Sequence, residues 1–219
     1  MVLGTARAVP SGRKSLSRMG RSDVVFLIRI LLIWVVGASI QFRWFLTTAH
    51  NRIAGNVGDN RLYIALSEHW YSVFRGLHSW NAPGFFYPQT GVLAYSDTFF
   101  LPALPYSLLR LAGCDPYIAF EGHFVVLTLL GFACTALLMR NHLGVRDSFA
   151  IFGAALFTFS NVNAIWIYAA QDYGVMLIPP VLLLASQGVR TRSWKYCSAA
   201  GFLLPLPGTS IWCWPRRQP

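Results

Sequence analysis

The sequence predicts an all-α membrane protein: a polytopic bundle of transmembrane helices with a long first loop outside the cytoplasm. Three observations support this prediction. Hydrophobic residues make up 55% of the 219 residues and charged residues only 12%, whereas a soluble domain has about 25% charged residues. Several apolar runs approach or exceed the roughly 20 residues that cross a bilayer. The loop after the first of these runs is long and rich in aromatic residues.

The charge balance supports the membrane interpretation. The formal net charge is +10, from 18 Lys and Arg residues against 8 Asp and Glu residues. A basic excess also suits proteins that bind nucleic acids, but here the basic residues fall mostly between apolar runs. Because basic residues mark the cytoplasmic loops of membrane proteins, we expect membrane lipids as partners and no nucleic acid.

The N-terminal part of the chain sets the orientation. Residues 1–22 are basic and lack a packing pattern, so we expect them in the cytoplasm. The first apolar run, about residues 24–45, is long enough to cross the hydrocarbon core. No small-residue cleavage site follows it cleanly, and it is expected to remain as a signal anchor. A transmembrane module is predicted over residues 23–202.

The loop of residues 43–98 should then lie outside the cytoplasm, and it is too long and too aromatic for a simple connector. Gly58 and Asp59 stand near its middle. Apolar residues recur at three- and four-residue spacing over 62–77, which predicts an amphipathic helix lying in the membrane interface. Asp59 precedes that helix, where its carboxylate can accept from free N–H groups of the first turn as an N-cap.

Further apolar runs follow the loop. The first, Phe99 to Ala112, contains two prolines and is short for a crossing, as re-entrant or interfacial runs are. Later runs are predicted at about 117–139, 148–169 and 174–185, the last interrupted by Pro179 and Pro180, and a final run begins near Tyr196. The irregular segment 203–219 resembles a truncated tail, so the module is expected to be incomplete.

Two topologies compete. If residues 99–112 cross the membrane, Arg140 and Arg146 lie outside and Asp172 lies inside. If they re-enter, the two later basic loops, 140–146 and 190–195, are cytoplasmic and Asp172 lies outside. The preference of Lys and Arg for cytoplasmic loops favours the second topology. Asp59 and Asp172 would then face the same compartment near the same membrane surface.

An enzyme that acts on a lipid-linked donor at the outer surface needs a carboxylate, a phosphate contact and an apolar groove for the lipid tail. Asp59 and Asp172 are the predicted catalytic and metal-binding residues, because Mg²⁺ or Mn²⁺ would take carboxylate and phosphate oxygens. Arg61 is a candidate phosphate contact. Asp97 and Tyr87, also in the outer loop, complete the predicted substrate-binding set.

Each of these residues also has a simpler structural interpretation. Asp59 can act only as a helix cap, Asp172 as a polar residue of a short turn, and Asp97 as the cap of the next segment. Glu121 and His123 lie near the outer end of a span. Ionisable groups within a membrane cost free energy and are often functional. The alternative is that both lie close enough to the surface to contact water. The sequence contains no nucleophile–base pattern, glycine-rich phosphate loop or zinc spacing.

The order of elements resembles that of a known superfamily. Short motifs stand at 58–63 (GDNRLY), 86–88 (FYP) and 101–106 (LPALPY). Together with a first span, a long outer loop bearing Gly-Asp and an interface helix, they resemble the GT-C superfamily of integral-membrane glycosyltransferases, including large uncharacterised bacterial proteins. The resemblance covers roughly residues 24–185, although this chain has fewer predicted crossings than is usual in the superfamily.

The resemblance implies transfer of a sugar from a polyprenyl-phosphate-linked or diphosphate-linked donor at the outer face of a membrane, here expected to be the bacterial inner membrane. It also implies that Asp59 is the first-loop acid, catalytic or metal-holding, and that Asp172 matches a second acid. The alternative is a non-catalytic membrane subunit or lipid-handling protein, or an inactive fragment.

Overall fold

The computed structural model describes residues 20–47, 55, 57–84, 88–89, 91, 93, 98–160, 163, 166–168 and 170–203. Within these residues the regular structure is helical and contains no strand, which confirms the predicted all-α class. The elements are α1 (Arg21–Gln41), α2 (Arg43–Thr47), α3 (Val57–Phe74), α4 (Phe100–Leu111), α5 (Pro116–Asn141), α6 (Asp147–Thr158), the 3₁₀ helices η2 (Trp166–Tyr168) and η3 (Asp172–Leu177), α8 (Ile178–Thr191) and α9 (Trp194–Leu203).

Three helical stretches in the described part are long and apolar enough to cross a membrane: Arg21–Gln41, Pro116–Asn141 and Asp172–Thr191. The first of them, α1, leaves most of its apolar side chains exposed, with Val36 at 61%. A helix that is apolar on its exposed face suits a lipid environment. These features confirm that the chain has the helices of a membrane protein.

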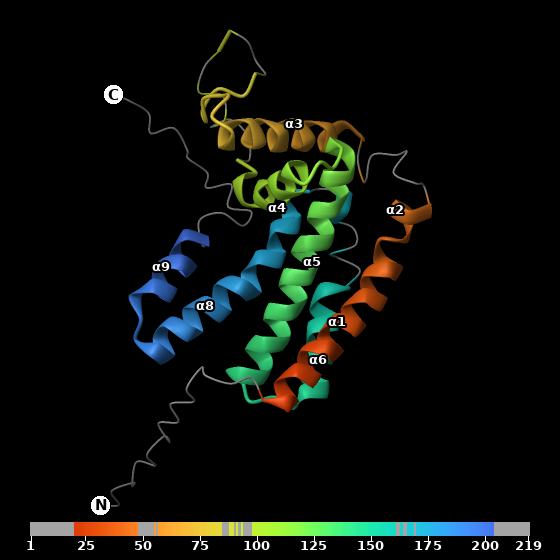
Figure 1. Ribbon diagram of the computed structural model, residues 1–219, viewed down its shortest axis with the longest axis vertical. Coiled ribbons are helices and arrows are strands. Elements are labelled where there is room, and N and C mark those ends of the chain that lie inside the picture. The colour runs from red at the N-terminus through yellow and green to blue at the C-terminus, as the bar shows by residue number, and fades with distance from the viewer. Residues whose placement is uncertain are drawn as a thin grey trace, which may run out of the picture.

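Helix α5 forms the centre of the bundle and contacts α1, α4, α6, η3 and α8 (Figure 1). It runs antiparallel to α1. The ion pair between Arg140, near the end of α5, and Asp23, at the start of α1, shows this orientation (3.0 Å). Helices α3 and α4 lie across the opposite end of the bundle (Figure 1). This is the arrangement expected for a helix in the plane of the membrane interface.

Helix α3 differs in detail from the prediction. It spans Val57–Phe74 rather than 62–77, so Asp59 lies within its first turn and is not the N-cap residue. Leu66 and Trp70 are buried as the spacing indicates, but Leu62 is exposed. The buried face is rotated toward α4 and the segment before it, since the Tyr63 ring stacks on Phe99 at 5.2 Å.

The structure agrees with the topology in which residues 99–112 do not cross. Helix α4 has 12 residues, which corresponds to about 18 Å and falls short of the roughly 30 Å hydrocarbon core. The two later basic loops also lie together. Burial lowers the pKa of His142, which follows α5, and the charge of Arg190 at the end of α8 lowers it further, so Arg190 lies near His142. Both loops share the end of the bundle at which α1 begins.

The predicted span 148–169 is wrong. Helix α6 stops at Thr158, because the side-chain amide of Asn163 donates to the last helical carbonyls, those of Phe157 and, at 3.3 Å, Thr158. These carbonyls have no intrahelical partner at a helix end. Helix α6 is therefore only 12 residues long, and the 3₁₀ helices η2 and η3 follow it in the described part of the chain.

The predicted interruption at Pro179 and Pro180 is also wrong. Both prolines lie in the first turn of α8, where a missing N–H breaks no helical hydrogen bond. Because η3 leads directly into α8, the two form one stretch of 20 residues, Asp172–Thr191. The final apolar run becomes α9, which folds back on α8 with Cys197 packed against Gly188. Residues 204–219, most of the predicted tail, lie outside the described residues.

Candidate functional site

The structure describes three of the five predicted site residues. Asp59 and Arg61 lie in the first turns of α3, and both are exposed. Asp172 is exposed as the first residue of η3. Tyr87 and Asp97 lie outside the described residues.

A partly buried hydrogen bond joins the segments that contain the two predicted acids. The Asn60 side-chain amide, next to Asp59, donates to the backbone carbonyl of Ile167 at 3.1 Å, a few residues before Asp172. Gly55 packs on the same carbonyl with a φ of +75°, and a Cβ there would lie 2.3 Å from the Ile167 oxygen. A larger residue would therefore separate the two segments.

These contacts place the two predicted acids in segments that meet, but they do not assemble a metal site. Among the described residues, no group of three or more His, Cys, Asp or Glu side chains is arranged to hold a metal ion. A hard cation can be held by one or two carboxylates when substrate phosphate supplies further oxygens. Asp59 and Asp172 offer ligands of that type, so the divalent cation remains a prediction.

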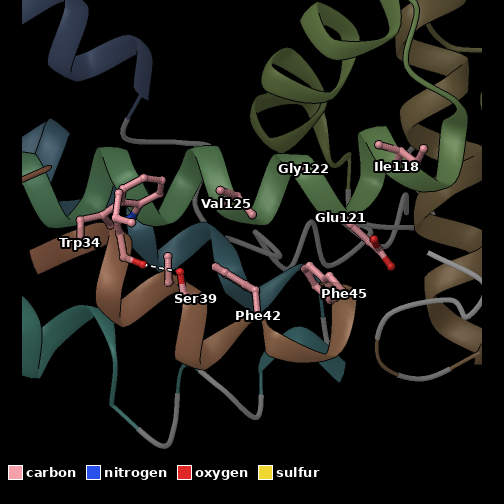
Figure 2. A pocket seen from close by; sticks show the side chains of 10 residues that line it. Trp34, Ser39, Phe42, Phe45, Ile118, Glu121, Gly122 and Val125 are labelled. Atoms are coloured by element: carbon pink, nitrogen blue, oxygen red, sulfur yellow. Dashed lines mark hydrogen bonds between the residues drawn. The ribbon is translucent and has the colours of Figure 1, made fainter. Parts of the chain in front are cut away.

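An apolar groove of about 290 Å³ lies between α1 and α2 on one side and α5 on the other (Figure 2). Trp34, Phe42 and Phe45 form one wall, and Ile118 and Val125 belong to the other. Its remaining lining residues are Val35, Ala38, Ser39, Glu121 and Gly122. A concave and mostly apolar cavity with a few polar groups is the usual form of a small-molecule site.

Glu121 is the charged residue of this groove. It projects from α5 beside Phe45, near the end of the helix that lies under α3 (Figure 2). Its side chain is only 3% exposed. The other polar lining residue, Ser39, donates its hydroxyl to the carbonyl of Val35 in its own helix at 2.7 Å. Ionisable groups inside membrane helices are costly and are usually retained for a function.

A chain of buried and partly buried hydrogen bonds links α1, η3 and α5. Thr128 Oγ1 donates to the Phe124 carbonyl (2.6 Å), so the Tyr173 hydroxyl must be the donor in its 2.7 Å contact with Thr128. Tyr173 then accepts from Gln41 Nε2 at 3.2 Å. Each hydroxyl therefore has a fixed direction, and the chain holds the end of α1 against α5.

His123 stands on α5 within a group of aromatic rings. Its Nδ1 lies against the Phe120 carbonyl, an acceptor, so this nitrogen must bear the proton. The ring is fully buried and packs against Phe99 and Phe124. Nε2 has no hydrogen-bond partner among the described residues, which leaves an acceptor in an apolar setting.

A second polar cluster fastens α3 to α4. Glu68 Oε1 accepts from the Tyr106 hydroxyl and from Arg110 Nε, each at 2.5 Å. Arg110 also donates to the Cys114 carbonyl and lies over the Tyr71 ring. Burial raises the pKa of Tyr106 above its usual range, and the hydrogen bond to Glu68 raises it further. Burial is the largest single effect on the pKa of Arg110 and lowers it, but Glu68, Tyr106 and Tyr71 together raise this pKa above its ordinary value.

Sequence reasoning identified Glu121 and His123 as ionisable residues within a span, but it did not find the groove. The groove exists only where the end of α1 meets the start of α5, and no local motif records that meeting. The Glu68 cluster was missed because its members lie on separate helices. Comparison with protein-family models, with curated proteins and with solved structures finds no match.

Proposed function

We propose that this chain is a membrane glycosyltransferase of the GT-C type, which transfers a sugar from a polyprenyl-phosphate-linked donor at the outer face of a bacterial inner membrane. The observation that supports this most is the apolar groove between α1 and α5, which ends at a buried carboxylate under α3. A lipid-linked donor needs such a groove for its hydrocarbon tail, next to polar groups for its head.

The predicted acids lie in segments at the end of the bundle where α1 ends and α5 begins, and Ile118 and Glu121 line the groove near that end. The contact between Asn60 and Ile167 joins the segments of Asp59 and Asp172, and α3 packs on the start of α5. Asp59 and Asp172 would hold a divalent cation, which stabilises negative charge on a leaving phosphate. Arg61, in the next turn of α3, provides a fork of N–H donors for a phosphate.

In this proposal Asp59 accepts a proton from the hydroxyl of the acceptor. The hydroxyl oxygen then forms a bond to the anomeric carbon of the sugar, and the bond from that carbon to the phosphate oxygen breaks. Polyprenyl phosphate leaves with the electron pair. General-base catalysis of this kind contributes roughly 10²- to 10⁴-fold to the rate.

Membranes that contain the protein or its Asp59→Asn variant test this proposal. With a polyprenyl-phosphate-linked sugar as donor, we expect glycosyl transfer to fall by about 100-fold or more in the variant. Asp23→Asn is the matched control, because Asp23 is an acid at the opposite end of the bundle. Equal transfer by Asp59→Asn and the unchanged protein would contradict the role of Asp59.

A second candidate function is lipid binding without chemistry, as a membrane subunit or lipid-handling protein. The same groove favours it, because the tail of a lipid can be held there with no catalytic group nearby. In that case lipids would bind the protein, whereas no glycosyl transfer would be seen in membranes with either Asp59 or Asn at this position.

A further inference from the structure

The two ends of the bundle differ in charge. At the helix ends where α1 begins and α5 stops, the described basic residues are Arg21, Arg140, Arg146, Arg190, Arg192 and Lys195, and the described acids are Asp23 and Asp147. Both of these acids pair with Arg140. At the other end the described acids are Asp59, Glu68, Asp115, Glu121 and Asp172, against Arg43, Arg61, Arg75 and Arg110. Among the described residues, positive charge therefore exceeds negative charge only at the first of these ends.

Two loops bring the excess positive charge together in a surface formed by residues 142–146 and 189–195, which we call the basic surface. Helix α5, which precedes the first loop, packs against α8, which leads into the second. Burial lowers the pKa of His142, and the positive charge of Arg190 lowers it further, so the two loops meet near these residues. Arg146, Arg190 and Lys195 are all exposed, and their charged groups are therefore accessible to an anion.

Exposed apolar side chains stand in the same two loops. Leu143 follows His142, Val189 precedes Arg190, and Trp194 begins α9 with 73% of its surface exposed. These residues lie at or just beyond the ends of Pro116–Asn141 and Asp172–Thr191, two stretches long enough to cross a membrane. Trp together with Lys and Arg at the end of such a helix is typical of the level of the lipid head groups. The combination fits an anion that carries hydrocarbon chains better than a free anion.

We propose that the basic surface binds the head group of an anionic phospholipid, with the phosphate among Arg146, Arg190 and Lys195 and the start of the hydrocarbon chains on Val189 and Trp194. A guanidinium can donate two parallel N–H groups to a phosphate, and basic clusters beside membrane helices favour anionic head groups. The groove between α1 and α5 has no part in this surface. The proposal therefore does not depend on the sugar transfer proposed above.

The protein reconstituted in vesicles of equal parts phosphatidylglycerol, phosphatidylcholine and phosphatidylethanolamine tests the proposal. After gentle release into detergent, mass spectrometry measures which lipids remain bound. Each basic residue close to an anionic head group strengthens binding by about fivefold. We therefore expect phosphatidylglycerol, the anionic lipid of the three, to be enriched about tenfold over each of the other two. Equal retention of the three lipids would overturn the proposal.

Two double variants of equal charge test whether the lipid binds at this surface. Arg190→Gln with Lys195→Gln removes two exposed charges from the basic surface, and the enrichment should fall by about fivefold or more. Arg43→Gln with Arg75→Gln removes the same charge from exposed side chains at the opposite end of the bundle and should leave the enrichment unchanged. Equal losses in the two double variants, or full enrichment in the first, would overturn the assignment to the basic surface.

Two further measurements distinguish a lipid from a free anion. Inorganic phosphate added to the lipid-bound protein should not displace phosphatidylglycerol, because the phosphate ion lacks the hydrocarbon chains that contact Val189 and Trp194. Trp194→Gln leaves the charge unchanged but removes the largest exposed apolar side chain of the surface, so retention of phosphatidylglycerol should fall several-fold. Displacement by phosphate, or full retention in Trp194→Gln, would contradict lipid binding. None of these measurements involves glycosyl transfer, so failure here is distinct from failure of the proposed function.

Discussion

Arg140 connects three helices at the end of the bundle opposite α3, and its replacement should loosen all three. Its guanidinium pairs with Asp23 of α1 and with Asp147 of α6, each at 3.0 Å. It also lies 4.3 Å from the centroid of the Phe26 ring, a fully buried side chain of α1. The charged group is 20% exposed, so solvent screens it only in part.

The expected cost of Arg140→Gln follows from these contacts. Each ion pair involves a partly exposed carboxylate and contributes roughly 0.2–1 kcal/mol. The contact with the Phe26 ring adds about 1 kcal/mol, because the guanidinium is partly desolvated there. We therefore expect the free energy of unfolding to fall by about 1.5–3 kcal/mol.

Reversible unfolding in a mild detergent would measure this loss, with Arg146→Gln as the control. Arg146 is an exposed arginine at the start of α6, a few residues after Arg140, and its loss should change stability by less than about 0.5 kcal/mol. The difference between the two variants should shrink at 1 M salt, where the screening length is about 3 Å. Equal stabilities of the two variants at low salt would refute the role given to Arg140.

Two further predictions concern the broken span and the loop beside it. Asn163→Leu should lower the free energy of unfolding by about 1–3 kcal/mol, because the carbonyls of Phe157 and Thr158 lose a buried donor; chemical denaturation would measure this, and an unchanged midpoint would contradict the capping role. Burial, and then Arg190, lowers the pKa of His142 in the folded protein. The unfolded chain therefore binds more protons, so stability should fall as the pH drops below about 6.5, and His142→Gln should flatten this dependence in unfolding measured from pH 7.5 to 5.

The helices that the sequence predicts well are those whose evidence is local. Helices α1 and α5 are long apolar runs, and hydrocarbon thickness alone fixes the length that such runs need. The short α4 was likewise recognisable from its length and its prolines. The break after α6 was not, because it depends on Asn163 folding back onto carbonyls earlier in the chain. Hydropathy counts side chains and does not record where the backbone finds its hydrogen bonds.

The residues of the candidate site also divide into those with local evidence in the sequence and those that depend on contacts between distant segments. Asp59 and Arg61 were found through a local pattern, the polar start of an amphipathic helix, and both lie at that start in the structure. The approach of the segment before Asp172 depends on Asn60, which reads in the sequence as an ordinary helix residue but is fully buried. The groove at Glu121 depends on the pairing of two helices distant in the chain, which periodicity within either helix cannot reveal.

The buried polar residues of the bundle separate into two groups: those that hold the chain after the end of α6, and Glu121, which lines the groove. Backbone groups inside a membrane bundle require internal partners. Asn60 donates to the Ile167 carbonyl in η2, and Asn163 donates to carbonyls at the end of α6. Tyr173, in η3, is held between Thr128 and Gln41. These side chains explain how a broken span is stabilised. Glu121 differs in position, because its helix α5 is unbroken and the residue lines the apolar groove that the proposed function gives to a lipid tail.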